Sequence, residues 1–176
     1  HIWFLRGVPS RIAMILGITA SAVEKVIYFA GYIVTSVSEQ DRVRILGELE
    51  TEFKAKLKTL QNEEARDALK ARADETKKEI ESITQGVVLD EATFHKFSIK
   101  YSTLFEAKIG AEAIYEVFKQ IDLAKLCEEL EDRYTKAGAM ERAKLDKRLA
   151  LIRGMLNAGV RPEWLFLVRI PVVPPA

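Results

Sequence analysis

The stretch from residue 39 to residue 84 limits the possible folds of this chain more than any other feature. It contains no proline, its only glycine is Gly47, and acidic and basic residues alternate along it. In its second half, apolar or weakly polar residues are spaced by four, three, four and three positions, at Leu69, Ala73, Thr76, Ile80 and Ile83. This spacing is typical of a heptad seam on one face of a helix. The stretch is therefore expected to be helical.

The first half of the same stretch has its own apolar positions at Leu46, Leu49, Phe53 and Leu60. Between the halves, Asn62 is a plausible helix cap, and the two glutamates after it suit a first helical turn. We therefore predict an antiparallel helical hairpin over residues 45–87 whose two seams bury each other. Its charges are nearly balanced, so we expect a lobe separate from the core. One continuous helix is the alternative, but its thin seam would then need a partner.

The flanking segments, residues 1–44 and 88–176, predict a module that is mainly α with a few short strands. Pro9-Ser10 opens a short helix that Gly17 ends, and Thr19 or Ser21 caps the next, Ser21 with Glu24 as a capping box. Gly31 is expected to stop that second helix. The β-branched and aromatic run from Tyr32 to Thr35 is typical of a strand. A second strand is expected over residues 165–170, and the two could pair.

Further helices are expected after the hairpin. One begins at Leu89-Asp90-Glu91, with Phe94, Phe97, Leu104 and Phe105 as core candidates, and another begins near Ala111. Asp122 can cap a third. The last helix has one apolar stripe, formed by Leu145, Leu149, Ile152 and Leu156.

No pattern in the chain predicts a catalytic residue or a metal ligand. Glycine-rich phosphate loops, nucleophile-elbow serines and cysteine or histidine clusters at zinc spacing are all missing from the sequence. Cys127 falls on an apolar helix stripe and is interpreted as a core residue. His95 has no convincing partner and is interpreted as a partly buried or surface histidine. A single cysteine fits a reducing, cytoplasmic compartment. No apolar run approaches the roughly 20 residues of a spanning helix, so no membrane contact is expected.

Basic residues gather in one region, although the net charge of the chain is only +1. Residues 133–153 contain seven lysines and arginines and two acidic residues. Lys144 and Lys147 fall away from the apolar stripe of their helix, so they are expected to face solvent. The pattern fits contact with a polyanion, and it fits a solvated helix face equally well.

Several blocks of the sequence resemble β′ subunits of bacterial RNA polymerase. They are HIWFLRGVPSRI at residues 1–12, VEKVIYFAGYIV at 23–34, EAKIGAEAI at 106–114, Ile121-Asp122-Leu123, Arg161-Pro162-Glu163-Trp164, and IPVVPP at 170–175. The blocks occur in family order and reach both ends of the chain. The hairpin departs from the resemblance, because familiar members connect the flanking segments more briefly. It is therefore interpreted as an insertion, and both ends of the chain look cut from a longer subunit.

The resemblance implies a non-catalytic segment of the clamp, the mobile wall that closes over DNA in a DNA-directed RNA polymerase. Partners through the parent subunit would be the β, α and ω subunits, a sigma factor and DNA. The zinc and magnesium ligands of the family would lie outside this chain. Clamps approach DNA with basic residues, so the candidate DNA contacts are Arg6, Arg11, Arg142, Lys144, Lys147 and Arg148. The competing hypothesis is a stand-alone helical coiled-coil interaction protein.

Overall fold

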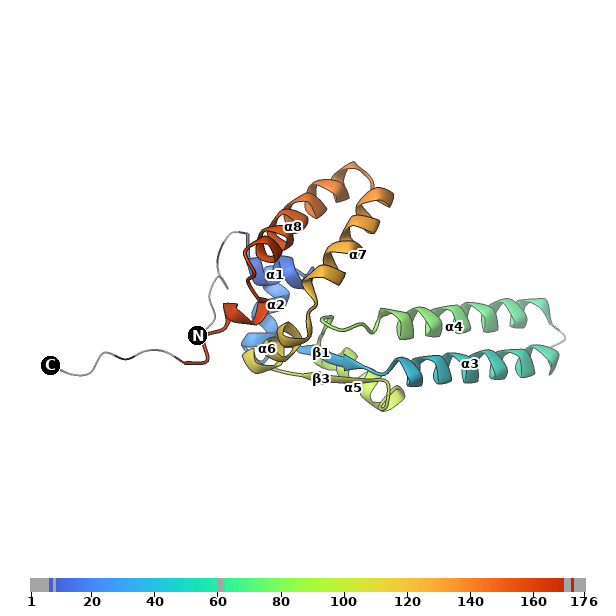
Figure 1. Ribbon diagram of the computed structural model, residues 1–176. Coiled ribbons are helices and arrows are strands. Elements are labelled where there is room, and N and C mark those ends of the chain that lie inside the picture. Colours follow the sequence, from blue (N-terminus) through green and yellow to red (C-terminus); the bar gives the residue numbers. More distant parts are fainter. Residues whose placement is uncertain (1–6, 8, 60–61, 170–171, 173–176) are drawn as a thin grey trace.

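The computed structural model describes Gly7, residues 9–59, residues 62–169 and Val172. Its elements in chain order are α1 (Arg11–Leu16), α2 (Ala20–Ile27), β1 (Tyr32–Val37), α3 (Glu39–Thr59), α4 (Glu63–Ser82), β2 (Val88–Leu89), α5 (Glu91–Lys100), β3 (Phe105–Lys108), α6 (Ala111–Gln120), α7 (Leu123–Lys136), α8 (Ala139–Asn157) and a 3₁₀ helix (Pro162–Leu165). The predicted fold class, mainly α with a few short strands, is confirmed. Two helical hairpins, α3–α4 and α7–α8, extend from a body that holds the sheet (Figure 1).

The caps of the first two helices decide where the N-terminal segment turns. Ser10 Oγ accepts a hydrogen bond from Ala13 N at 3.3 Å, and Gly17 ends α1 with φ at 74°. Thr19 caps α2 by accepting from Ala22 N at 3.2 Å, so the expected capping box of Ser21 with Glu24 is wrong. Thr19 is still extended while Ser21 already lies inside the helix. The helix then ends at Ile27, before Gly31, and Phe29 makes the turn with a φ of 62°.

The sheet has the order β2-β1-β3, with both neighbours antiparallel to β1. The strand predicted from the sequence as the partner of β1 is not the one that pairs with it. Over residues 165–169 the expected strand is wrong, because the 3₁₀ helix takes up Leu165 and Phe166 forms only an isolated bridge outside the three-stranded sheet. Ile170, the last residue of the expected strand, lies outside the described residues. Instead, β1 pairs with Val88–Leu89 and with Phe105–Lys108. Leu89 is therefore in a strand, and the next helix begins at Glu91, where Asp90 Oδ1 accepts from Thr93 N at 2.7 Å.

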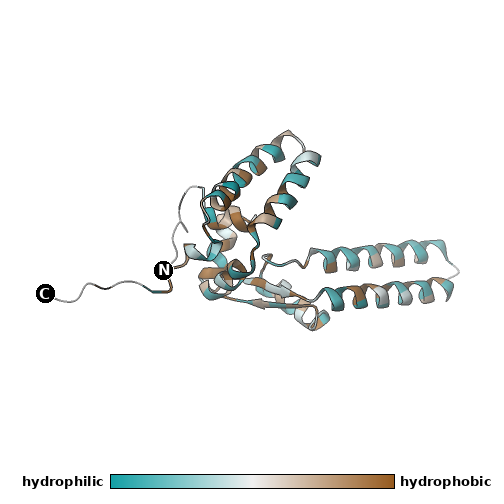
Figure 2. Ribbon diagram, viewed as in Figure 1, coloured by the Kyte–Doolittle hydropathy of each residue, from teal (hydrophilic) through white to brown (hydrophobic). Residues whose placement is uncertain are grey.

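The predicted antiparallel hairpin is confirmed as α3 packed against α4 (Figure 1). Asn62 caps α4 by accepting a hydrogen bond from Glu64 N at 3.1 Å. Half-buried side chains lie between the helices, at Leu46, Leu49, Phe53, Leu57, Leu69, Ala73 and Thr76. Hydrophilic positions otherwise predominate along both helices (Figure 2). Leu60, expected in the seam, lies outside the described residues, and the expected boundary at residue 45 falls inside α3.

The base of the hairpin is part of the core, which corrects the expectation of a separate lobe. Ile80 and Ile83 are fully buried, and they pack in one cluster with Val34 of β1 and with Leu104. The side chain of Arg42 in α3 reaches across to donate a hydrogen bond to Ile83 O at 2.6 Å. The distal turns of the hairpin protrude, whereas the last turn of α4 packs in the core beside β1.

A second, larger core lies among α1, α2, α6, α7 and α8. Its fully buried side chains include Ile12, Val26, Phe118 and Ile152. The stripe predicted on α8 is confirmed at Leu145, Leu149 and Ile152, but Met155 takes the last inward position and Leu156 is 38% exposed. A helix of 3.6 residues per turn drifts relative to a fixed heptad count, which explains the change at the final turn.

Candidate nucleic-acid interface

Helix α8 presents Lys144 and Lys147 to solvent, as predicted. Both side chains are exposed, whereas Leu145 and Leu149 on the other face of the helix are buried in the core. Among the residues that the structure describes, no carboxylate forms an ion pair with either lysine. Both amino groups are therefore available to an external anion, on a helix that the core holds in place.

Arg142 lies on the same helix but turns back toward α7. Its Nη2 donates to Thr135 O at 3.3 Å, and its guanidinium carbon lies 5.5 Å from the centre of the Tyr134 ring. The side chain remains exposed, so these contacts orient the guanidinium at the tip of the α7–α8 hairpin rather than bury it.

Arg148 does not share the exposed face. Its Nε donates to Met14 O at 2.7 Å and its Nη2 to Ile15 O at 3.2 Å, so it satisfies carbonyl groups at the C-terminal end of α1. Burial lowers the pKa of its guanidinium, and the neighbouring positive charge of Arg133 lowers it further. The helical spacing from Lys144 to Arg148 suggested a common face, but packing against α1 turns Arg148 inward.

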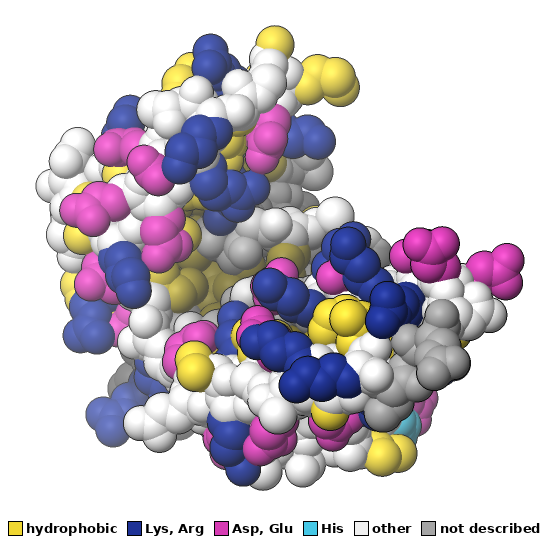
Figure 3. All heavy atoms as spheres, turned by 90° about the vertical axis from the view of Figure 1, so that its right-hand side faces the viewer, with side chains coloured by type: hydrophobic (Ala, Val, Ile, Leu, Met, Phe, Trp, Pro, Cys, Tyr) yellow, Lys and Arg dark blue, Asp and Glu magenta, His cyan; other side chains and the backbone are white. Residues whose placement is uncertain are grey.

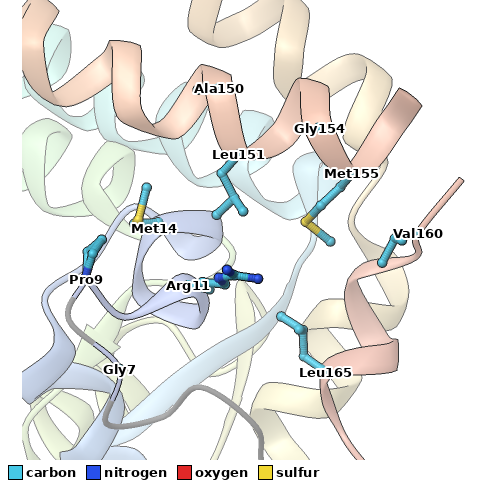
Figure 4. Close-up of a pocket in the computed structure, with 10 residues that line it drawn as sticks. All are labelled: Gly7, Pro9, Arg11, Met14, Ala150, Leu151, Gly154, Met155, Val160 and Leu165. Carbon is cyan, nitrogen blue, oxygen red and sulfur yellow. The ribbon is translucent and has the colours of Figure 1, made fainter. Parts of the chain in front are cut away.

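The remaining candidates lie elsewhere. Arg11 extends over a pocket of about 630 Å³ between α1 and α8, whose other walls include Met14, Leu151 and Met155 (Figure 4). The structure therefore does not place Arg11 in one cluster with Lys144 and Lys147. Arg6 lies outside the described residues.

A recess of about 350 Å³ lies between α1 and the α7–α8 hairpin. Lys144, Lys147 and Arg148 line it from α8, Arg133 lines it from α7, and Ala13, Met14 and Ile18 contribute apolar surface. Arg133 donates to Glu141 Oε1 at 3.2 Å, and both side chains are more than half exposed. Arg133 belongs to the basic region of residues 133–153 but is not among the predicted DNA contacts. Nothing in the spacing of the sequence shows that α7 and α8 face each other here.

A hollow separates the α7–α8 hairpin from the α3–α4 hairpin (Figure 3). Lys and Arg side chains appear on the α7–α8 hairpin above the hollow and around the tip of the α3–α4 hairpin below it (Figure 3). Acidic side chains are interspersed on both, so the basic character is local. This agrees with a net charge of only +1 for the whole chain.

Cys127 lies in the core, as the apolar stripe of its helix predicted, and His95 lies at the surface. Cys127 is 8% exposed, and burial raises the pKa of its thiol, which donates to Glu131 Oε1 at 3.5 Å. His95 is exposed beside the Phe94 ring. Within the described residues, no three His, Cys, Asp or Glu side chains are placed to hold a metal ion together, and no helix has the length and apolarity to cross a bilayer.

No protein-family model matches the chain, but individual curated proteins do. It is 31% identical over 175 residues to the DNA-directed RNA polymerase subunit beta′ of Caldicellulosiruptor saccharolyticus, with 99% of this chain and 12% of that protein covered. The subunit beta′ of Fusobacterium nucleatum is also 31% identical, with 99% and 10% covered. That of Dehalococcoides mccartyi is 25% identical over 201 residues, with 99% and 16% covered.

The similarity extends over nearly every residue of the chain, whereas the chain spans only 10 to 16% of the length of these relatives. An independent coiled-coil interaction protein finds no support in these matches. The chain therefore belongs to the family of DNA-directed RNA polymerase β′ subunits, and it corresponds to one segment of such a subunit.

Proposed function

We propose that this chain is a clamp segment of a DNA-directed RNA polymerase, and that it helps to hold DNA through the exposed lysines of α8. The parent enzyme would be a nucleotidyltransferase, with its magnesium and zinc ligands on other parts of the subunit. The β, α and ω subunits and a sigma factor would be partners through that parent. The observation that carries the proposal is the pair of exposed amino groups of Lys144 and Lys147 without an intramolecular carboxylate among the described residues.

Phosphate contacts suit the task of a clamp. Transcription passes over every sequence, so the wall that holds the duplex must grip it without reading bases. Contacts to phosphate oxygens position a protein on DNA without specifying a sequence. Lysine is well suited to this role, because its amino group is a mobile point charge on a flexible stem.

The helix beneath these lysines is held firmly. Leu145, Leu149 and Ile152 are at most 4% exposed, and Arg148 ties the same turns of α8 to α1. A phosphate-binding face on such a helix does not have to be ordered when DNA arrives, which reduces the entropy lost on binding.

The proposal is tested in the complete polymerase by changing Lys144 and Lys147 to alanine in β′. Elongation complexes are assembled on two templates of unrelated sequence, and their dissociation is followed at increasing salt concentration. Each lost phosphate contact is expected to reduce the slope of log affinity against log salt by about 0.9. The double variant should therefore lose up to about 1.8, and by the same amount on both templates.

The matched control changes Lys119 and Lys125 to alanine, two exposed lysines on α6 and α7 that lie outside the recess. It removes the same net charge and should leave the slope unchanged. An unaltered slope in the Lys144 and Lys147 variant would mean that this face is only a solvated surface. A loss confined to one template would indicate base recognition, which phosphate contacts do not explain.

A further inference from the structure

The recess between α1 and the α7–α8 hairpin, called the α1–α8 notch from here on, has an unequal set of charges. Its lining contains four cations, Arg133, Lys144, Lys147 and Arg148, and one carboxylate, Glu141. The notch therefore has an excess of positive charge around apolar side chains. Charges beside apolar surface interact more strongly than charges in open water, because less solvent screens them.

Arg148 contributes a charge that the protein does not neutralise. Its hydrogen bonds go to two main-chain carbonyl oxygens, and within the described part of the chain no carboxylate lies within ion-pair distance of its guanidinium. Burial, and after it the nearby charge of Arg133, makes the protonated form of Arg148 less favourable. An anion in the notch would relieve this repulsion between the two arginines.

Glu141 partly fills that role in the free chain. It lies in the first turn of α8, three residues before Lys144, and it accepts a hydrogen bond from Arg133 Nη2 at 3.2 Å. Both side chains remain exposed, at 61% for Arg133 and 53% for Glu141. An exposed ion pair of this kind is weak and exchanges readily with other partners. A phosphate offers Arg133 a stronger partner, since the guanidinium can donate two parallel hydrogen bonds to phosphate oxygens.

We propose that the α1–α8 notch binds one DNA backbone phosphate, and that Arg133 is a phosphate ligand which exchanges Glu141 for DNA. The inference rests on the proposed function, since it extends the lysine face of α8 to a residue on α7. Lys144 and Lys147 contact neighbouring phosphates of the same backbone, Arg148 supplies fixed positive charge within the notch, and Glu141 competes with DNA for Arg133.

The experiment uses the complete polymerase with three β′ variants, Arg133→Ala, Glu141→Gln and the combination of both. Dissociation of elongation complexes is measured against salt concentration on two unrelated double-stranded templates. Arg133→Ala is expected to reduce the salt slope by about 0.9 on both templates. Glu141→Gln should increase the salt resistance, because it removes the competing carboxylate. The gain from Glu141→Gln should disappear when Arg133 is also changed.

Arg153→Ala is the matched control. Arg153 forms the same kind of ion pair between α8 and α7, to Glu131 Oε1 at 2.8 Å, with 56% of its side chain exposed, but it does not line the notch. It should leave the slope unchanged. If Arg153→Ala and Arg133→Ala weaken the complexes equally, the ion pairs only brace the two helices and the inference is overturned.

Three further outcomes separate the inference from the function on which it rests. If the Lys144 and Lys147 variant loses salt slope while Arg133→Ala does not, the clamp function stands and the notch is not a phosphate site. If Glu141→Gln strengthens the complexes to the same extent with and without Arg133, Glu141 acts only as a distant charge and the exchange is refuted. If Arg133→Ala lowers the slope while the lysine variant does not, Arg133 is supported as a phosphate ligand and the proposed DNA contact by Lys144 and Lys147 is refuted.

Discussion

Arg148 in α8 donates a hydrogen bond from Nε to the main-chain oxygen of Met14 in α1, at 2.7 Å. A second bond joins its Nη2 to Ile15 O at 3.2 Å, and a Cβ added at Gly17 would lie 2.8 Å from the guanidinium. The C-terminal end of α1 is thus capped by a side chain more than 130 residues later in the chain. This link holds α8 in the position that exposes Lys144 and Lys147.

Replacing Arg148 with alanine is expected to destabilise the fold by about 2 to 3 kcal/mol, because two charge-assisted hydrogen bonds to half-buried carbonyls are lost. Lysine at this position should not restore stability, since one amino group cannot reach both carbonyls in the same geometry. Urea unfolding of the chain measures the difference. The control, Arg142→Ala, should cost about 0.5 kcal/mol. Equal losses in the two variants would contradict the capping role.

The carboxylate of Glu79 joins the hairpin to α5. It accepts hydrogen bonds from Lys96, from Lys100 at 2.9 Å and from Tyr101 Oη at 3.1 Å, and its side chain is 15% exposed. The hydrogen bond from Lys96, followed by that from Lys100, lowers the pKa of Glu79 to about 2 from its ordinary value of 4.5. Because the folded pKa is depressed, this contribution to stability is complete above about pH 4.5 and is lost as the pH falls toward 2.

Glu79→Gln should therefore reduce stability at neutral pH by about 1 to 2 kcal/mol, less than the full shift implies, because solvent screens the two exposed lysines. The variant and the original chain should converge in stability near pH 2. Glu81→Gln is the control on the same helix, with a side chain 53% exposed and 4.0 Å from Lys77 Nζ. A pH dependence between 5 and 2 that is identical in all three proteins would show that Glu79 is not the responsible group.

The two ends of the α3–α4 hairpin should respond differently to truncation of their apolar side chains. Ile80→Ala removes a fully buried side chain from the core beside β1 and should cost about 3 kcal/mol. Leu69→Ala, on the same helix but half-buried in the distal seam, should cost about 1 kcal/mol. Replacing residues 50–75 with a short linker should leave thermal unfolding of the remainder cooperative. Removing residues 46–84 should abolish cooperative unfolding, since both Ile80 and Ile83 are lost. A cooperative transition in that deletion would show that the base of the hairpin is not part of the core.

Glycine-to-alanine substitutions should change stability in opposite directions at two positions. Gly110 has a φ of 90°, and a Cβ there would lie 3.1 Å from the Phe29 ring, so Gly110→Ala should cost about 1 to 3 kcal/mol. Gly154 lies inside α8, and within the described residues no atom outside its own stretch of helix lies within 4 Å of an added Cβ. Gly154→Ala should therefore stabilise the chain by about 1 kcal/mol through helix propensity. Thermal unfolding measures both. Destabilisation by Gly154→Ala would indicate a contact that the fold does not show.

Local chemistry was sufficient to predict much of this fold. The seam of α4, the cap at Asn62, the cap at Asp122 and the stop at Gly17 all depend on residues within a few positions of one another. Helix capping and heptad spacing act over such short distances, so they can be read from the order of residues alone. The exposure of Lys144 and Lys147 followed in the same way from the stripe of α8.

Tertiary structure alone decided the pairing of β1, the position of Arg148 and the contact between Arg133 and Glu141. Each of these joins elements that the sequence does not place relative to each other. The strand Phe105–Lys108 contains charged residues that do not suggest a strand, and its partner is 70 residues away. Helical spacing alone puts Arg148 on the face of Lys144. Burial against α1 provided carbonyl partners for that guanidinium, which made the interior position favourable. The sequence thus determined which helices form and which lysines face solvent, and packing determined which basic residues share a recess.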